Sequence, residues 1–120
     1  FFLFFFKEAL NFEKWRYNFK ELEGFVSFII LFGSILHSPK KANDIYVLNL
    51  VDKENFNKVD KIIRKIQITQ NKKVHSIEIT KEELVKELKN KNKAYFEMFK
   101  KGVVLFGQEN FIKFIKSYDG

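Results

Sequence analysis

Apolar residues near the start of the chain recur at helical spacing. Phe12, Trp15, Phe19 and Leu22 lie three or four residues apart, which places them on one face of a helix that ends at Gly24. Charged and polar residues fall on the other faces, as an amphipathic helix packed against a core requires. The pattern therefore predicts a first packing helix.

Two continuous apolar runs follow, over 25–32 and 44–51. They have the length of strands and are rich in β-branched and aromatic residues, so they predict strands buried on both faces. The segment between them, 35–43, carries Pro39, the only proline of the chain. It predicts a short helical turn followed by a loop.

The second half of the chain predicts further helices around two more strands. Strands are expected over 74–79 and 103–106, and helices over 55–65, 80–90, 94–101 and from 111 onwards. Thr80 and Glu83 have the spacing of a capping box, in which hydroxyl and carboxylate satisfy each other's free backbone donors. The order predicts one domain over 1–120, an α+β fold with a small mixed β-sheet covered by helices.

The chain opens with six apolar residues, and Lys7 and Glu8 end this run. Six residues are too few for a membrane span or for the apolar region of a signal peptide. We therefore expect a first strand or a core-facing lead-in to the first helix, and no membrane partner.

Composition narrows the classes of partner. The chain has no cysteine, so disulfides and thiolate metal sites are excluded, and an intracellular, cytoplasmic protein is expected. The net charge of +7 suits an anionic partner such as a nucleotide, RNA or an acidic protein. A lysine-coated surface explains the same charge without any partner, and no aromatic–basic repeat typical of RNA-binding modules accompanies it.

Gly33 and Ser34 directly follow the first apolar strand. Glycine lets the backbone approach a bulky anion closely, and free N–H groups at a helical turn beginning at Ser34 favour a phosphate. The alternative is a plain turn that ends the strand, because Gly-Ser is common in turns. Asp44 begins the second strand beyond the loop.

Residues 32–34, the loop after them and 44–48 together resemble the signature of DNA polymerase β-type nucleotidyltransferases. In that family a strand, a Gly-Ser turn, a short helix and a loop lead to an Asp-x-Asp strand. Segment 74–84 resembles the family's third strand and threonine-led helix, and 102–107 resembles its closing segment. The likeness is to the small, single-domain "minimal" nucleotidyltransferases of archaea and bacteria, over 25–114.

The resemblance implies a site. Active members hold divalent metal ions with three carboxylates, two of them one residue apart on the second strand and the third on the neighbouring strand. By position, Asp44 matches the first carboxylate, Tyr46 stands at the second and His75 at the third. Asp44 is thus the implied catalytic and metal-binding residue, His75 a catalytic candidate, and Gly33 with Ser34 the nucleotide-binding pair. The implied cofactor and substrate are Mg²⁺ or Mn²⁺ and an NTP, with ATP preferred.

Two of the three expected carboxylates are replaced. A phenol ionises only at about pH 10, and imidazole is a poor ligand for Mg²⁺, although it can bind zinc or manganese-like ions or act as a base. Glu78 lies three residues from His75, so strand alternation places it on the opposite face. Asp52 is expected to cap the following helix.

Three functions follow from these observations. The first is transfer of a nucleoside monophosphate from an NTP to an acceptor hydroxyl, with weak or no turnover. The second is a catalytically degenerate binding module, either a homo-oligomer or an antitoxin-like partner of a helical HEPN-type protein. The third is direct RNA binding through the basic charge. His37, Lys40 and Lys41 in the loop are further candidates for phosphate contact, with plain solvent exposure as the alternative.

Overall fold

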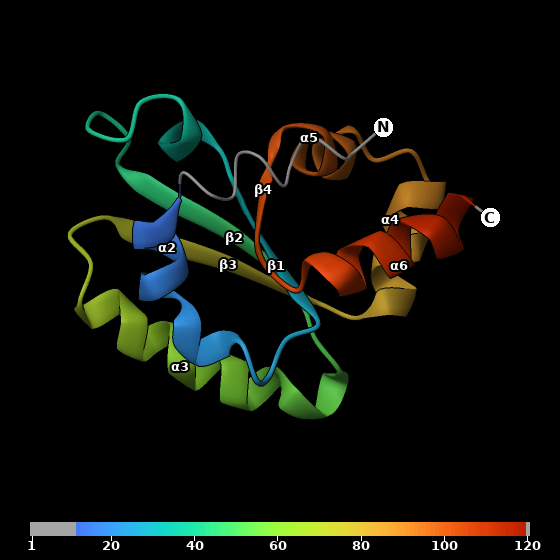
Figure 1. Ribbon diagram of the computed structural model, residues 1–120, viewed down its shortest axis with the longest axis horizontal. Helices are drawn as coiled ribbons and strands as arrows, with labels where there is room; N and C mark the ends of the chain where they lie inside the picture. Colours follow the sequence, from blue (N-terminus) through green and yellow to red (C-terminus); the bar gives the residue numbers. More distant parts are fainter. Residues whose placement is uncertain (1–11, 120) are drawn as a thin grey trace.

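The computed structural model describes residues 12–119, which form a four-stranded sheet with helices on both faces (Figure 1). The strands are β1 (Phe28–Phe32), β2 (Asp44–Leu50), β3 (Lys73–Ile79) and β4 (Val103–Phe106). Their order is β3-β2-β1-β4; β1 is antiparallel to β2 and to β4, whereas β2 and β3 are parallel. The predicted α+β fold with a small mixed sheet is confirmed.

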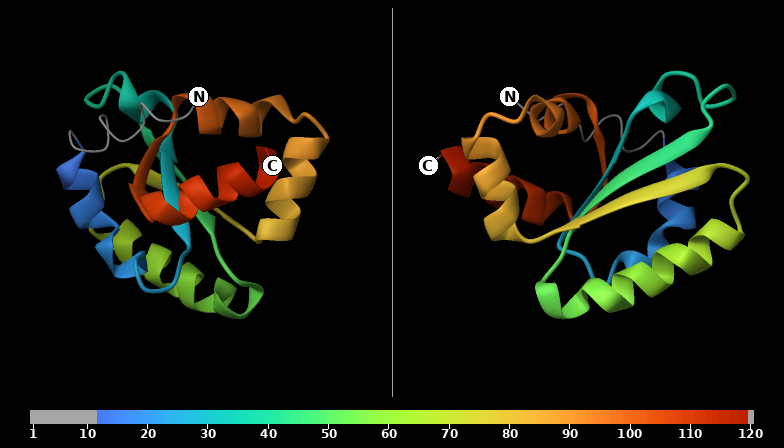
Figure 2. Two further views of the ribbon diagram at one scale, coloured as in Figure 1. Left: turned by 45° about the vertical axis from the view of Figure 1, so that its right-hand side comes forward. Right: turned by 180° about the vertical axis from the view of Figure 1, so that it is seen from behind.

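Each face of the sheet carries its own helices (Figures 1 and 2). On one face lie α2 (Glu13–Asn18) and α3 (Phe56–Ile68). On the other lie α4 (Lys81–Lys89), α5 (Lys93–Lys101) and α6 (Gln108–Asp119). No helix within 12–119 is both long enough and apolar enough to cross a membrane.

Alternation along β1 explains why both faces are apolar. Ile29 and Leu31 pack in the cluster under α2 and α3, whereas Phe28 and Ile30 pack in the cluster under α4, α5 and α6. All four side chains are fully buried. The predicted burial of this strand on both faces is confirmed, although the strand begins at Phe28 rather than at residue 25.

The first helix differs from its prediction in one respect. The α-helix ends at Asn18, and a 3₁₀ helix, η1 (Lys20–Leu22), continues the segment. Trp15, Phe19 and Leu22 are nevertheless all buried, as predicted. The Leu22 N–H donates to the Phe19 carbonyl at 3.0 Å, and this tighter turn keeps residues three apart on one side.

The capping predictions have opposite outcomes. At the start of α4, the Glu83 N–H donates to Thr80 Oγ1 at 3.2 Å and the Thr80 N–H donates to Glu83 Oε1 at 3.0 Å, so the capping box is confirmed. The prediction for Asp52 is wrong, because it makes no side-chain cap. Asp52 precedes a 3₁₀ helix, η3 (Lys53–Asn55), and α3 begins only at Phe56. The predicted first strand or helix lead-in over the first six residues lies outside the described residues.

Candidate functional site

The chain turns at Gly33, between β1 and a 3₁₀ helix, η2 (Ser34–Leu36). Gly33 has φ +94° and ψ −168°, a conformation almost restricted to glycine. A Cβ at this position would lie 3.1 Å from Cδ2 of Tyr46. Both the torsion angles and the close approach of Tyr46 therefore require glycine here, while Ser34 is exposed at the start of η2.

Asp44, Tyr46 and His75 meet on the sheet face that carries α4, α5 and α6. Asp44 and Tyr46 are two residues apart on β2, so their side chains point to the same face. His75 is the direct partner of Tyr46 on β3. His75 Nε2 lies 2.8 Å from Asp44 Oδ1, and each side chain is 40% exposed.

An aromatic row crosses three strands beside this pair. The rings of Tyr46 and His75 are stacked, with centroids 4.7 Å apart and planes inclined by 15°. Phe32 on β1 continues the row, its ring centroid 5.6 Å from that of Tyr46. Tyr46 therefore lies between Phe32, at the end of β1, and His75 of the Asp44–His75 pair.

The other candidates lie elsewhere. Glu78 points to the opposite face, as predicted, where its Oε2 accepts from Asn49 Nδ2 at 3.3 Å. Lys40 and Lys41 are exposed in the loop before β2. His37 follows η2 and faces a pocket rather than the Asp44–His75 pair.

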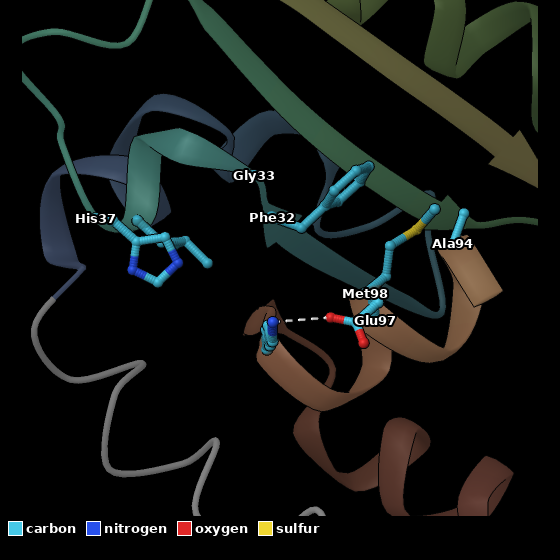
Figure 3. A pocket seen from close by; sticks show the side chains of 8 residues that line it. Phe32, Gly33, His37, Ala94, Glu97 and Met98 are labelled. Atoms are coloured by element: carbon cyan, nitrogen blue, oxygen red, sulfur yellow. Dashed lines mark ion pairs between the residues drawn. The ribbon is translucent and has the colours of Figure 1, made fainter.

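This pocket, of about 240 Å³, lies between η2 and α5 (Figure 3). Its lining is mainly apolar and comprises Phe32, Gly33, Leu36, His37, Ala94, Glu97, Met98 and Lys101. Lys101 Nζ lies 3.0 Å from Glu97 Oε2 at the rim, and this hydrogen bond and charge lower the pKa of Glu97. The α5 wall was missed by sequence reasoning, since 94–101 shows only the spacing of a packing helix.

The residues present do not fit a Mg²⁺ site. Asp44 is the one carboxylate at the three expected positions, and it is engaged with an imidazole. Mg²⁺ requires near-octahedral oxygen ligands, which a phenol and an imidazole do not supply. Across residues 12–119, no three His, Asp or Glu side chains come together to hold a metal ion.

Searches against protein-family models, curated proteins and solved structures return no match for this chain.

Proposed function

We propose that this chain is a nucleotidyltransferase-like domain that binds a nucleotide beside Gly33 without metal-dependent transfer. The observation that carries the proposal is the convergence of Asp44, Tyr46 and His75. Neighbouring positions on β2 and β3 meet on one face, as a carboxylate triad would, but two of them hold a phenol and an imidazole.

The order of elements supports the same reading. The first strand, the Gly33 turn, η2 and the strand that begins at Asp44 follow one another as in the family pattern. The β2–α3–β3 crossover then places the third position directly beside the second.

The pocket between η2 and α5 is the proposed place for the base. Its volume of about 240 Å³ falls below the range of about 300–1,000 Å³ for pockets that enclose drug-sized ligands. It would therefore enclose a ring system rather than a whole nucleotide. Phe32, Leu36 and Met98 offer apolar contacts, while His37 and Lys101 place polar and cationic groups at the rim.

Calorimetric titration with ATP, ADP and adenosine, each with and without Mg²⁺, tests the binding. We expect ATP to bind equally well in both conditions, because no metal bridges it to the protein. Ala94→Trp fills the pocket and should abolish binding. Phe96→Trp is the matched control, since it adds the same ring to α5 outside the pocket lining. If no ligand binds in any condition, the nucleotide proposal is wrong.

Restoring the carboxylates tests the catalytic half of the proposal. The double variant Tyr46→Asp with His75→Asp places three carboxylates at converging positions, so it should bind Mn²⁺, as read by electron paramagnetic resonance. The parent chain should leave Mn²⁺ free. Transfer of labelled nucleotide by the parent chain in the presence of Mg²⁺ would refute the loss of catalysis.

A domain that binds a nucleotide but does not transfer it would function through a binding partner. The resemblance implies a helical HEPN-type protein as one such partner, and co-purification with the product of the adjacent gene tests it. Direct RNA binding remains a separate prediction. It requires an affinity that falls steeply with salt, because phosphate contacts release counterions.

A further inference from the structure

One edge of the sheet is open within the described residues. β3 is at the end of the strand order and pairs only with β2 (Figures 1 and 2). His75 and Ser76, like the two residues that follow, are partly exposed. At the opposite end, the residues of β4 are all buried, and Arg16 of α2 lies over the ring of Phe106 at 6.0 Å.

The backbone groups of β3 point alternately to β2 and to the outer edge. The Lys73 N–H donates to the Asn43 carbonyl at 3.2 Å, and the Ile79 carbonyl accepts from the Val51 N–H at 3.0 Å. Odd-numbered residues therefore bond to β2. Alternate residues of a paired strand direct their N–H and C=O groups to opposite sides. The N–H and C=O groups of the even-numbered residues therefore point away from β2, to the outer edge.

At both ends of this edge, side chains of the same chain form hydrogen bonds with the outward-pointing backbone groups. The Val74 N–H donates to Gln67 Oε1 at 2.7 Å, and Gln67 Nε2 donates to the Lys72 carbonyl at 2.9 Å. At the other end, the Thr80 N–H donates to Glu83 Oε1 at 3.0 Å. The N–H groups of Ser76 and Glu78 remain without a partner among residues 12–119.

We propose that this edge pairs with the same edge of a second copy of the chain, antiparallel and centred on Ser76. A two-fold axis perpendicular to the sheet then passes between the two Ser76 residues, which exchange both of their backbone hydrogen bonds. The Glu78 N–H of each copy donates to the Val74 carbonyl of the other. Every open donor is used, and the Val74 N–H stays on Gln67.

Charge complementarity between Lys73 and an acidic groove favours the register centred on Ser76. Lys73 of each copy comes opposite Ile79 of the other, beside a groove of about 320 Å³. The groove is lined by Ile77, Glu78, Ile79, Glu83, Lys86, Glu87 and Tyr95. The Glu83 and Glu87 carboxylates lie here against the Lys86 ammonium, and burial together with the Glu87 and Glu83 carboxylates raises the pKa of Tyr95. The Lys73 ammonium complements this excess of negative charge.

The neighbouring registers are worse. A shift that pairs Ser76 with Glu78 moves Lys73 past the end of β3 of the second copy, to the level of Lys81 at the start of α4, so Lys73 loses its partner Ile79 beside the groove. The opposite shift aims the Glu78 N–H at the Lys72 carbonyl, which already accepts from Gln67. The centred register alone avoids both penalties.

Sedimentation and amide hydrogen exchange of the unmodified chain test the proposal directly. At high concentration we expect the mass of two chains and slow exchange at Ser76 and Glu78. On dilution these two amides should exchange fast, whereas Val74 stays protected by Gln67 at every concentration. A monomer up to millimolar concentration, with fast exchange at Ser76 and Glu78 throughout, would overturn the proposal.

Paired variants locate the interface. Ser76→Pro removes an outward N–H and leaves the bonds to β2 intact, a position where proline is tolerated on edge strands. It should give a monomer, while Ser76→Ala keeps the N–H and should stay dimeric. Lys73→Glu should weaken the dimer at least tenfold, whereas Lys61→Glu on α3 should leave it unchanged. A Ser76→Pro chain that remains a dimer would place the interface elsewhere.

Discussion

Asp44 on β2 and His75 on β3 are joined by a contact of 2.8 Å between Oδ1 and Nε2, beside the stacked rings of Tyr46 and His75. The parallel pairing of β2 with β3 brings together residues 31 positions apart. The contact uses the one carboxylate that the nucleotidyltransferase resemblance assigns to metal binding. Because this carboxylate is bonded to His75, the contact is consistent with the proposed loss of metal-dependent transfer.

The contribution of this contact to stability should be small. Each side chain is 40% exposed, and measured coupling energies of exposed charged or hydrogen-bonded pairs are about 0.2–1 kcal/mol. A double-mutant cycle with Asp44→Ala, His75→Ala and both together, read by urea unfolding, should give a coupling within that range. A coupling several times larger would indicate that the pair anchors β3 to β2.

Gly33→Ala should lower the free energy of unfolding by about 1–3 kcal/mol, because alanine is strained at φ +94° and ψ −168°. Its Cβ would also press on the Tyr46 ring at 3.1 Å. Gly24→Ala is the matched control, since nothing lies within 4 Å of a Cβ there. Urea midpoints measure both variants, and equal midpoints would contradict the strain at Gly33.

Gln67→Ala should destabilise the chain by about 1–3 kcal/mol, because it leaves the N–H of the buried Val74 and the Lys72 carbonyl without their partner. The same change frees a third donor on the outer edge of β3. Gln70→Ala should have little effect, since the Gln70 side chain donates to the exposed Thr69 hydroxyl and the backbone bond of Gln70 to Gln67 is kept. Thermal unfolding compares the two variants, and equal losses would show that the Gln67 bonds contribute nothing specific.

Stability should depend on pH through the capping box of α4. The hydrogen bonds from the Thr80 backbone and side chain lower the pKa of Glu83 below its ordinary value of 4.5. A lowered pKa means that the folded chain holds fewer protons than the unfolded one in this range. The contribution is therefore complete above the ordinary value and is lost as pH falls through the lowered one.

Glu83→Gln tests this dependence. Unfolding free energies measured from neutral to acidic pH should fall less steeply for Glu83→Gln than for the parent chain. Glu82→Gln, in the same helical turn but with no side-chain hydrogen bond among residues 12–119, should follow the parent curve. Parallel curves for all three chains would count against the capping contribution.

Local pattern determined most of the elements. Apolar periodicity located the buried face of α3, the continuous apolar run 25–32 indicated a strand buried on both faces, and the Thr80–Glu83 spacing marked the start of α4. These signals arise from residues close in sequence. The prediction that Asp52 caps the following helix was wrong because it, too, rested on local sequence alone. A cap-forming residue type is visible in the chain, but the 3₁₀ turn that separates it from α3 is not.

Alternation alone placed Asp44 with Tyr46, and His75 opposite to Glu78, on given faces of their strands. The chain alone did not determine that His75 contacts Asp44 or stacks on Tyr46, because both depend on the register between β2 and β3. Nor did it reveal that α5 walls the pocket beside Gly33, or that Gln67 closes one end of an open edge. These contacts join residues far apart in sequence, and only the packed fold brings them within hydrogen-bond or van der Waals distance.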